Sequence, residues 1–132
     1  METRKPENRR FVDARAMVAA LQPSYPVYCL KPAALIEAAQ RFIDLFPGRV
    51  LYAVKCNPHP RVLRTLWAGG IRHFDTASLS EIAMVREIFR EAGIYFMHPV
   101  KGRAVIKTAW RVYGVDHFIV DHPDELAKVL EE

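Results

Sequence analysis

From residue 49 onward, short apolar runs alternate with longer segments that repeat apolar residues at helical spacing. The short runs are rich in β-branched and aromatic residues, and three of the longer segments end at glycine, as helices commonly do. This alternation predicts consecutive βα units. The expected strands are 49–55, 71–75, 94–98 and 116–120, and the expected helices are 60–70, 78–93, 101–114 and 122–132.

The chain before residue 49 has a different pattern. "YPVYCL" (25–30) indicates an extra strand, and residues 31–46 indicate a helix that ends at Pro47-Gly48. The first ten residues hold four basic side chains and no apolar residue after Met1, which favours a solvated tail over a basic arm for an acidic partner. We therefore expect a basic tail and lead-in over 1–24 and a folded domain over 25–132.

A polar residue ends each of the four expected strands, namely Lys55, Asp75, His98 and Asp121. These positions lie about 20 to 23 residues apart, and a βα unit repeated at that length predicts a parallel sheet, either doubly wound or part of a barrel. The first strand is not followed by G-x-G-x-x-G, which disfavours dinucleotide binding. A closed barrel needs about eight such units, so the four units predict its N-terminal half.

Charge and composition exclude several classes of protein. The formal net charge is only +4, and the first ten residues hold four of the cations, so the rest of the chain is nearly neutral and unsuited to nucleic acid. No membrane span or secretory leader is expected, which favours the cytoplasm. Cys29 and Cys56 lie in apolar runs, and we expect buried, reduced thiols there. His59 and His73 have no partner at metal-ligand spacing, so no metal site is expected.

Lys55 is the candidate for chemistry, because it ends an apolar strand directly. A partly desolvated lysine has a lowered pKa and can attack a carbonyl group. Strand alternation would place Leu51, Ala53 and Lys55 on one face, where the small Ala53 leaves room for a cofactor ring. The alternative is a lysine at the rim of the sheet that only reaches into water.

The wording around Lys55 resembles a known family. "YAVKCN" (52–57) followed by "FDTASLSEI" (74–82) resembles the ornithine/diaminopimelate/arginine decarboxylases, the fold-type III enzymes that use pyridoxal phosphate (PLP). "AVKCN" is closest to the ornithine decarboxylase branch, and the likeness continues through "HPVK" (98–101) and "IVDHPDEL" (119–126). It implies the N-terminal half of a PLP-binding, TIM-like barrel.

This resemblance implies roles for particular residues. Lys55 matches the lysine that bonds to PLP, while Asp75 and Glu81 match acidic residues of the same pocket, with Ala53 also expected beside the cofactor. The implied reaction is the decarboxylation of L-ornithine to putrescine in polyamine biosynthesis, by a parent enzyme that is a homodimer. Lysine, arginine or diaminopimelate are alternative substrates, and a racemase-like PLP barrel is an alternative enzyme.

Most of these residues also have purely structural interpretations. Asp75 could pair or cap near a strand end, and Glu81 stands three residues after Ser78, as in a capping box. His98 is expected to be a polar residue at a strand end, and Asp121 the N-cap of the last helix.

The later motifs of the family are not present in these 132 residues. They include the glycine-rich phosphate loop, the acidic partner of the pyridine nitrogen, and the C-terminal β-domain, which supplies a cysteine–aspartate pair across the dimer. Two hypotheses follow: the N-terminal part of an amino-acid decarboxylase, or a non-catalytic remnant that binds a homologue or itself. We expect the 132-residue chain alone to be inactive and to self-associate.

Overall fold

A computed structural model describes residues 9–132, and their contacts divide the chain at Leu30 into two units. In the first unit, residues Ala14–Leu21 form helix α1, which was not predicted from the sequence. Asp13 caps it by accepting a hydrogen bond from Ala16 N at 2.7 Å. The prediction of a solvated tail concerns residues 1–10 and lies almost wholly outside the described residues.

The extra strand expected at residues 25–30 is not formed. These residues have no sheet pairing, and Val27 and Tyr28 are exposed. The physical reason is that a strand needs a neighbour to satisfy its backbone groups, and the described chain supplies none at this position.

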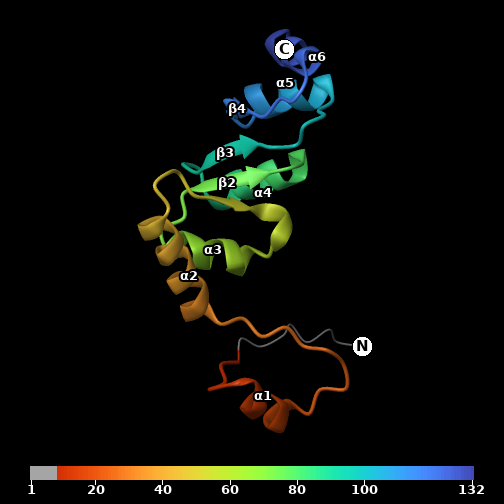
Figure 1. Ribbon diagram of the computed structural model, residues 1–132. Coiled ribbons are helices and arrows are strands. Elements are labelled where there is room, and N and C mark those ends of the chain that lie inside the picture. The colour runs from red at the N-terminus through yellow and green to blue at the C-terminus, as the bar shows by residue number, and fades with distance from the viewer. Residues whose placement is uncertain (1–8) are drawn as a thin grey trace. The chain divides into compact units, whose positions relative to one another are not determined.

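In the second unit, residues 31–132, four parallel strands form one sheet in the order β1-β2-β3-β4 (Figure 1). This confirms the predicted βα repeat. A helix connects each strand to the next one, which is the usual connection between neighbouring parallel strands. The strands are β1 (Leu51–Ala53), β2 (His73–Thr76), β3 (Gly93–Phe96) and β4 (His117–Phe118), and the helices are α2 (Pro32–Leu45), α3 (Pro60–Ala68), α4 (Leu79–Ile88), α5 (Arg103–Arg111) and α6 (Pro123–Leu130).

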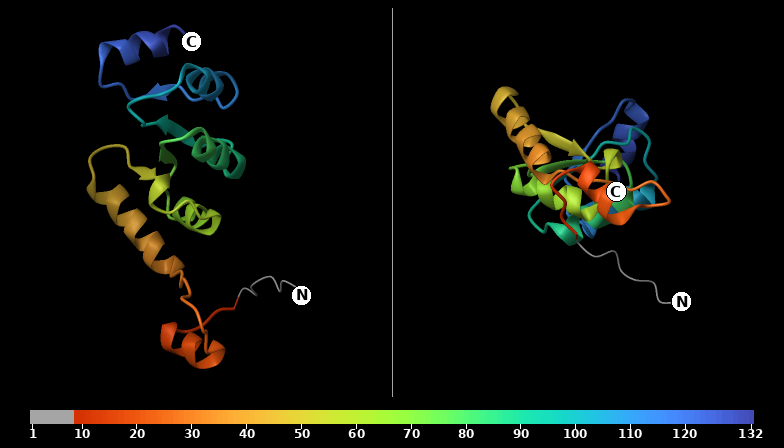
Figure 2. Two further views of the ribbon diagram at one scale, coloured as in Figure 1. Left: turned by 90° about the vertical axis from the view of Figure 1, so that its right-hand side faces the viewer. Right: turned by 90° about the horizontal axis from the view of Figure 1, so that it is seen from below.

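The two faces of the sheet differ. Helices α3, α4 and α5, which connect successive strands, lie along one face, while α2 and α6 lie toward the other side (Figure 2). The covered face is apolar: Phe74, Ile94 and Phe96 are buried beneath the helices. Trp67 of α3 stacks on Phe89 with ring centroids 4.3 Å apart, and this aromatic contact extends the core between helices.

We call the other side of the sheet the open face. The register aligns Leu51, His73 and Gly93 in one row, and Ala53, Asp75, Tyr95 and His117 in the next. Alternation places both rows on the face away from α3, α4 and α5. No residue of these two rows is buried.

Several predicted boundaries were wrong by a few residues. Strand β1 ends at Ala53 rather than Lys55, because a 3₁₀ turn (Val54–Cys56) follows it and buries Val54. Helix α4 ends at Ile88 rather than Gly93, where Phe89 enters the core. The N-cap of α6 is His122, not Asp121, since the His122 side chain accepts from Asp124 N at 3.2 Å.

Among residues 9–132, none of the helices is long and apolar enough to cross a membrane.

Candidate active site

The turn that presents Lys55 is held from both sides. Val54 is completely buried and anchors the turn in the core. The Tyr52 hydroxyl donates to the carbonyl oxygen of Asn57 at 3.3 Å, and Asn57 Oδ1 accepts from His59 N at 3.1 Å. Burial raises the pKa of Tyr52, the nearby Cys56 acts in the same direction, and the bond to Asn57 opposes them. Tyr52 therefore stays a neutral donor that fixes the end of the turn.

Lys55 itself is exposed at the middle of this turn. Within the described part of the chain it makes no hydrogen bond and no ion pair. The strand alternation that would have continued from Ala53 to Lys55 is broken by the turn, so that prediction was wrong. Cys56 and Cys29 are also exposed, which corrects the expectation of buried thiols; both are free.

Ala53 and Asp75 are direct register partners on β1 and β2. Both are half-buried and lie in the same row of the open face. Since parallel strands end at one edge, Asp75 lies one strand away from the turn that holds Lys55. Asp75 has no hydrogen bond or ion pair to any described residue. It is therefore not the strand-end cap that the structural interpretation required.

Glu81 lies in the first turn of α4, and its carboxylate is turned toward the start of its own helix. Its Oε2 accepts from Ala77 N at 2.8 Å, while Ser78 Oγ accepts from Glu81 N at 3.3 Å. This is the capping arrangement that Ser78 and Glu81 predicted. One carboxylate oxygen is thus engaged in capping, and any contact of Glu81 with a cofactor stays a prediction.

Lys101, a second lysine near this edge, was not predicted from the sequence to have a structural role. The Lys101 side chain has 0% exposure, and its Nζ lies 2.9 Å from Glu125 Oε1. The same amine donates to three carbonyl oxygens, those of His98 at 3.1 Å, Pro99 at 3.2 Å and Ile119 at 2.6 Å. Lys101 therefore joins the segments that follow β3 and β4. The motifs "HPVK" and "HPDEL" contained both partners, but only the fold pairs them.

Three histidines at this edge share one local structure. His59, His98 and His122 each precede a proline, and each Nδ1 accepts the N–H of the residue two positions on at 3.2 Å. His59 and His122 thereby cap α3 and α6. His98 was expected to end its strand, but β3 ends at Phe96, so His98 lies in the loop that follows the strand.

A cluster of larger side chains occupies the open face beside Asp75. Tyr95 contacts His117 with ring centroids 4.4 Å apart, and its hydroxyl accepts from Arg49 at 2.6 Å. His73 meets the Tyr95 ring edge-on at 5.8 Å. Burial lowers the pKa of His73, and electrostatic interactions with Arg49 and His117 act in the same direction. No periodic pattern in the sequence marks this cluster, because its members come from separate strands.

A free amine in the turn after the first strand of a parallel α/β sheet is the arrangement of enzymes that bond a carbonyl compound through lysine. The sequence family described as "Pyridoxal-dependent decarboxylase, pyridoxal binding domain" matches residues 32–132. The chain belongs to this family, whose cofactor is pyridoxal phosphate. The resemblance inferred from "YAVKCN" and "FDTASLSEI" is therefore confirmed.

Individual relatives support the same assignment. An ornithine decarboxylase of Leishmania donovani is 35% identical over 114 residues, which is 83% of this chain and 16% of that protein. A lysine/ornithine decarboxylase of Selenomonas ruminantium is 37% identical over 81 residues, or 61% of this chain and 20% of that protein. The chain thus spans a fifth or less of these two curated relatives.

Solved structures agree with the fold. A lysine decarboxylase of Selenomonas ruminantium superposes with a TM-score of 0.77 at 28% identity, over 92% of this chain and 32% of that one. The arginine decarboxylase of Paramecium bursaria Chlorella virus superposes with a TM-score of 0.75 at 31% identity, over 87% of this chain and 31% of that one. The four βα units are therefore part of a PLP-dependent decarboxylase barrel, as predicted.

The residues present include an amine of the kind that bonds the aldehyde of pyridoxal phosphate. Lys55 is exposed and has no partner among the described residues, whereas Lys101 is buried against four acceptors. Only the first of these two amines is available to an aldehyde. The open face beside it offers the small Ala53 and an unpaired Asp75 carboxylate.

Proposed function

We propose that these 132 residues are the N-terminal part of a decarboxylase for a basic L-amino acid, with L-ornithine as its substrate and putrescine as its product. The observation that carries the proposal is the unpaired Lys55 amine in a fixed turn at the carboxyl end of β1. Ornithine is supported by the names of two relatives, the ornithine decarboxylase of Leishmania donovani and the lysine/ornithine decarboxylase of Selenomonas ruminantium.

In this proposal each residue of the site has one task. Lys55 bonds the cofactor, which supplies an electron sink when an α-amino acid loses its carboxylate. Asp75 offers a negative charge beside the cofactor, and Ala53 leaves space for a flat ring. Glu81 holds the start of α4 and presents its second carboxylate oxygen to the pocket. The proposed enzyme is a cytoplasmic homodimer, as the family resemblance implies.

The first experiment tests the lysine in the 132-residue chain. The protein is incubated with pyridoxal phosphate, reduced with borohydride, and the modified peptide is mapped by mass spectrometry. We expect labelling at Lys55 and none at Lys101. Lys55→Ala should abolish the specific label, and Lys107→Ala, which removes an exposed lysine of α5, is the matched control. Labelling spread evenly over exposed lysines would contradict the assigned role of Lys55.

The second experiment tests the reaction and the substrate. Release of carbon dioxide is measured with ornithine, lysine, arginine and diaminopimelate, using the 132-residue chain and any longer product of the same gene. We expect no turnover by the 132-residue chain, because four strands leave one flank of the site open to water. A longer product should prefer ornithine. A longer product that is folded yet inactive on all four amino acids would favour a non-catalytic remnant.

A further inference from the structure

His73 lies on the open face of β2, and one of its two ring nitrogens has no partner. The Nδ1 atom is buried from water, and within the described residues it neither donates nor accepts a hydrogen bond. It lies against Gly93, the register partner of His73 on β3, because a Cβ atom at Gly93 would be only 2.1 Å from Nδ1. A buried side-chain nitrogen without a partner is uncommon in proteins, and it constrains the protonation state of the ring.

The missing partner determines which nitrogen of His73 carries the proton. A neutral imidazole has one N–H and one bare nitrogen, whereas the imidazolium has two N–H donors. A donor that is buried without an acceptor loses its hydration, and a charged donor loses more. We therefore assign the proton of the neutral ring to Nε2. A second proton, at Nδ1, would be buried against Gly93 with no acceptor.

The charged groups around His73 do not favour a second proton either. Burial lowers the pKa of His73 most, and Arg49, which precedes β1, and His117 of β4 act in the same direction. Asp75 follows two residues later on the same face of β2, and Asp116 lies 2.5 Å from His117 Nδ1. Among the described residues neither carboxylate forms an ion pair with His73, so neither compensates a cation there.

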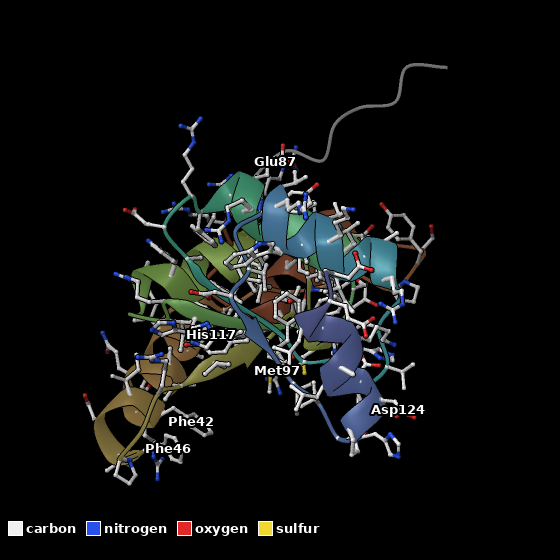
Figure 3. All side chains as sticks on the ribbon, turned by 90° about the horizontal axis from the view of Figure 1, so that it is seen from above. Phe42, Phe46, Glu87, Met97, His117 and Asp124 are labelled. Carbon is white, nitrogen blue, oxygen red and sulfur yellow. The ribbon has the colours of Figure 1, made fainter. Side chains whose placement is uncertain are left out.

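The His73 ring belongs to a row of contacts that crosses the open face. It meets the Tyr95 ring of β3 edge-on, with ring centroids 5.8 Å apart. The Tyr95 hydroxyl accepts from Arg49 at 2.6 Å, and its ring lies 4.4 Å from that of His117. Figure 3 shows His117 on the side of the sheet away from Glu87 of α4. The three rings therefore connect β2, β3 and β4, and Arg49 joins them to the segment before β1.

We propose that His73 is an acid-sensitive lock of the open face. The neutral ring packs on Gly93 and Tyr95 and holds β2 to its neighbours. When acid forces a second proton onto the ring, Nδ1 has to turn away from Gly93 to reach water, and the contact with Tyr95 is lost. Tyr95 is the register partner of Asp75, so the row that loosens is the one that also carries Ala53 and Asp75. This lock does not depend on the proposed decarboxylation or on pyridoxal phosphate.

The sign of the pH effect follows from the direction of the pKa shift. The pKa of His73 in the folded chain is lower than its ordinary value of 6.5, so well above pH 6.5 the residue does not affect stability. As the pH falls below 6.5, the unfolded chain binds a proton that the folded chain does not, and stability declines until the folded pKa is passed. Between about pH 7.5 and about pH 5.5, His73 alone should raise the equilibrium constant for unfolding by up to about tenfold.

NMR signals of the imidazole rings in the 132-residue chain, followed as the pH is lowered from about 7.5 to about 4.5, test the lock directly. We expect the His73 ring to stay neutral, with its proton on Nε2, below pH 6.5. The Tyr95 ring signals should shift when His73 finally takes up a proton, whereas those of Ile94, which is buried on the covered face, should not. Protonation of His73 at or above pH 6.5, or protonation that leaves Tyr95 unchanged, would overturn the proposal.

Urea unfolding at the same two pH values, about 7.5 and about 5.5, tests the contribution of His73 to stability. His73→Phe keeps a flat ring that cannot be protonated and should remove most of the tenfold change, and His73→Gln is a second uncharged variant in case the first does not fold. His122→Asn is the matched control, since it removes an exposed histidine and keeps a side-chain acceptor at the N-cap of α6. Circular dichroism establishes that each variant is folded. An unchanged pH dependence in the folded His73 variants, or an equal reduction in His122→Asn, would overturn the proposal.

Discussion

The Nζ of Lys101 lies 2.9 Å from Oε1 of Glu125, and this ion pair is inaccessible to water on the lysine side. Glu125 Oε1 also accepts the backbone N–H of Lys101 at 3.0 Å. A buried ammonium is tolerated only when its donors are all satisfied, and here one carboxylate and three carbonyl oxygens surround it. The pair therefore fixes the loops that follow β3 and β4 relative to each other.

Replacing Lys101 should destabilise the fold strongly. Lys101→Met keeps the apolar stem but leaves three carbonyl oxygens without their donor and removes one of the donors to the Glu125 carboxylate, which keeps the backbone N–H of residue 101 and the Lys128 amine. We expect the free energy of unfolding to fall by about 3 kcal/mol. Urea denaturation followed by circular dichroism measures this, with Lys107→Met on the exposed side of α5 as the control. Equal stability of the two variants would show that the buried pair contributes nothing.

The same pair predicts how stability depends on pH. The hydrogen bond from Lys128, together with the hydrogen bonds and the charge of Lys101, lowers the pKa of Glu125 to about 2, although burial opposes this shift. A carboxylate with a depressed pKa stabilises the fold above its unfolded pKa, near 4.5, and this contribution disappears as the pH falls from there toward about 2. The advantage of the wild type over Glu125→Gln should therefore shrink across that range. An advantage that is constant from pH 6 to pH 2.5 would contradict the assignment.

Gly93 is required by the His73 ring on the neighbouring strand. A Cβ atom at Gly93 would lie 2.1 Å from His73 Nδ1, which no packed side chain tolerates. We expect Gly93→Ala to lower the free energy of unfolding by about 1 to 3 kcal/mol through overpacking. In a double-mutant cycle, His73→Ala should remove most of this cost because the clashing ring is gone. Additive effects of the two changes would mean that the clash is relieved elsewhere.

Glu81 has two roles in this proposal, capping α4 and contacting the cofactor, and a variant of its capping partner Ser78 distinguishes them. Ser78→Ala removes the hydroxyl that accepts from Glu81 N and should cost about 1 kcal/mol of stability. As long as the Ser78→Ala variant is folded, its labelling at Lys55 by pyridoxal phosphate and borohydride should be unchanged. Glu81→Ala should lower stability to a similar extent and also reduce the labelling. If both variants reduce labelling equally, Glu81 acts only through the helix.

The sequence by itself determined the order and type of the elements in residues 31–132. Apolar runs of strand length and helical repeats that end at Gly70 and Gly114 are local signals, because a residue with positive φ stops a helix wherever it occurs. Ser78 and Glu81 lie three residues apart, so their capping bond could also be predicted. The family followed from two short motifs around Lys55 and Asp75.

The tertiary structure decided what depends on neighbours distant in sequence. Lys101 and Glu125 are 24 residues apart and meet only because β3 and β4 are adjacent. The turn at Lys55 replaces the predicted strand end, because a 3₁₀ helix begins at Val54 directly after the last paired residue of β1. Residues 25–30 have strand-like composition but no pairing partner, and a strand is stable only when another strand satisfies its backbone. Local pattern sets each element, whereas pairing and burial set where it ends and which side chains meet.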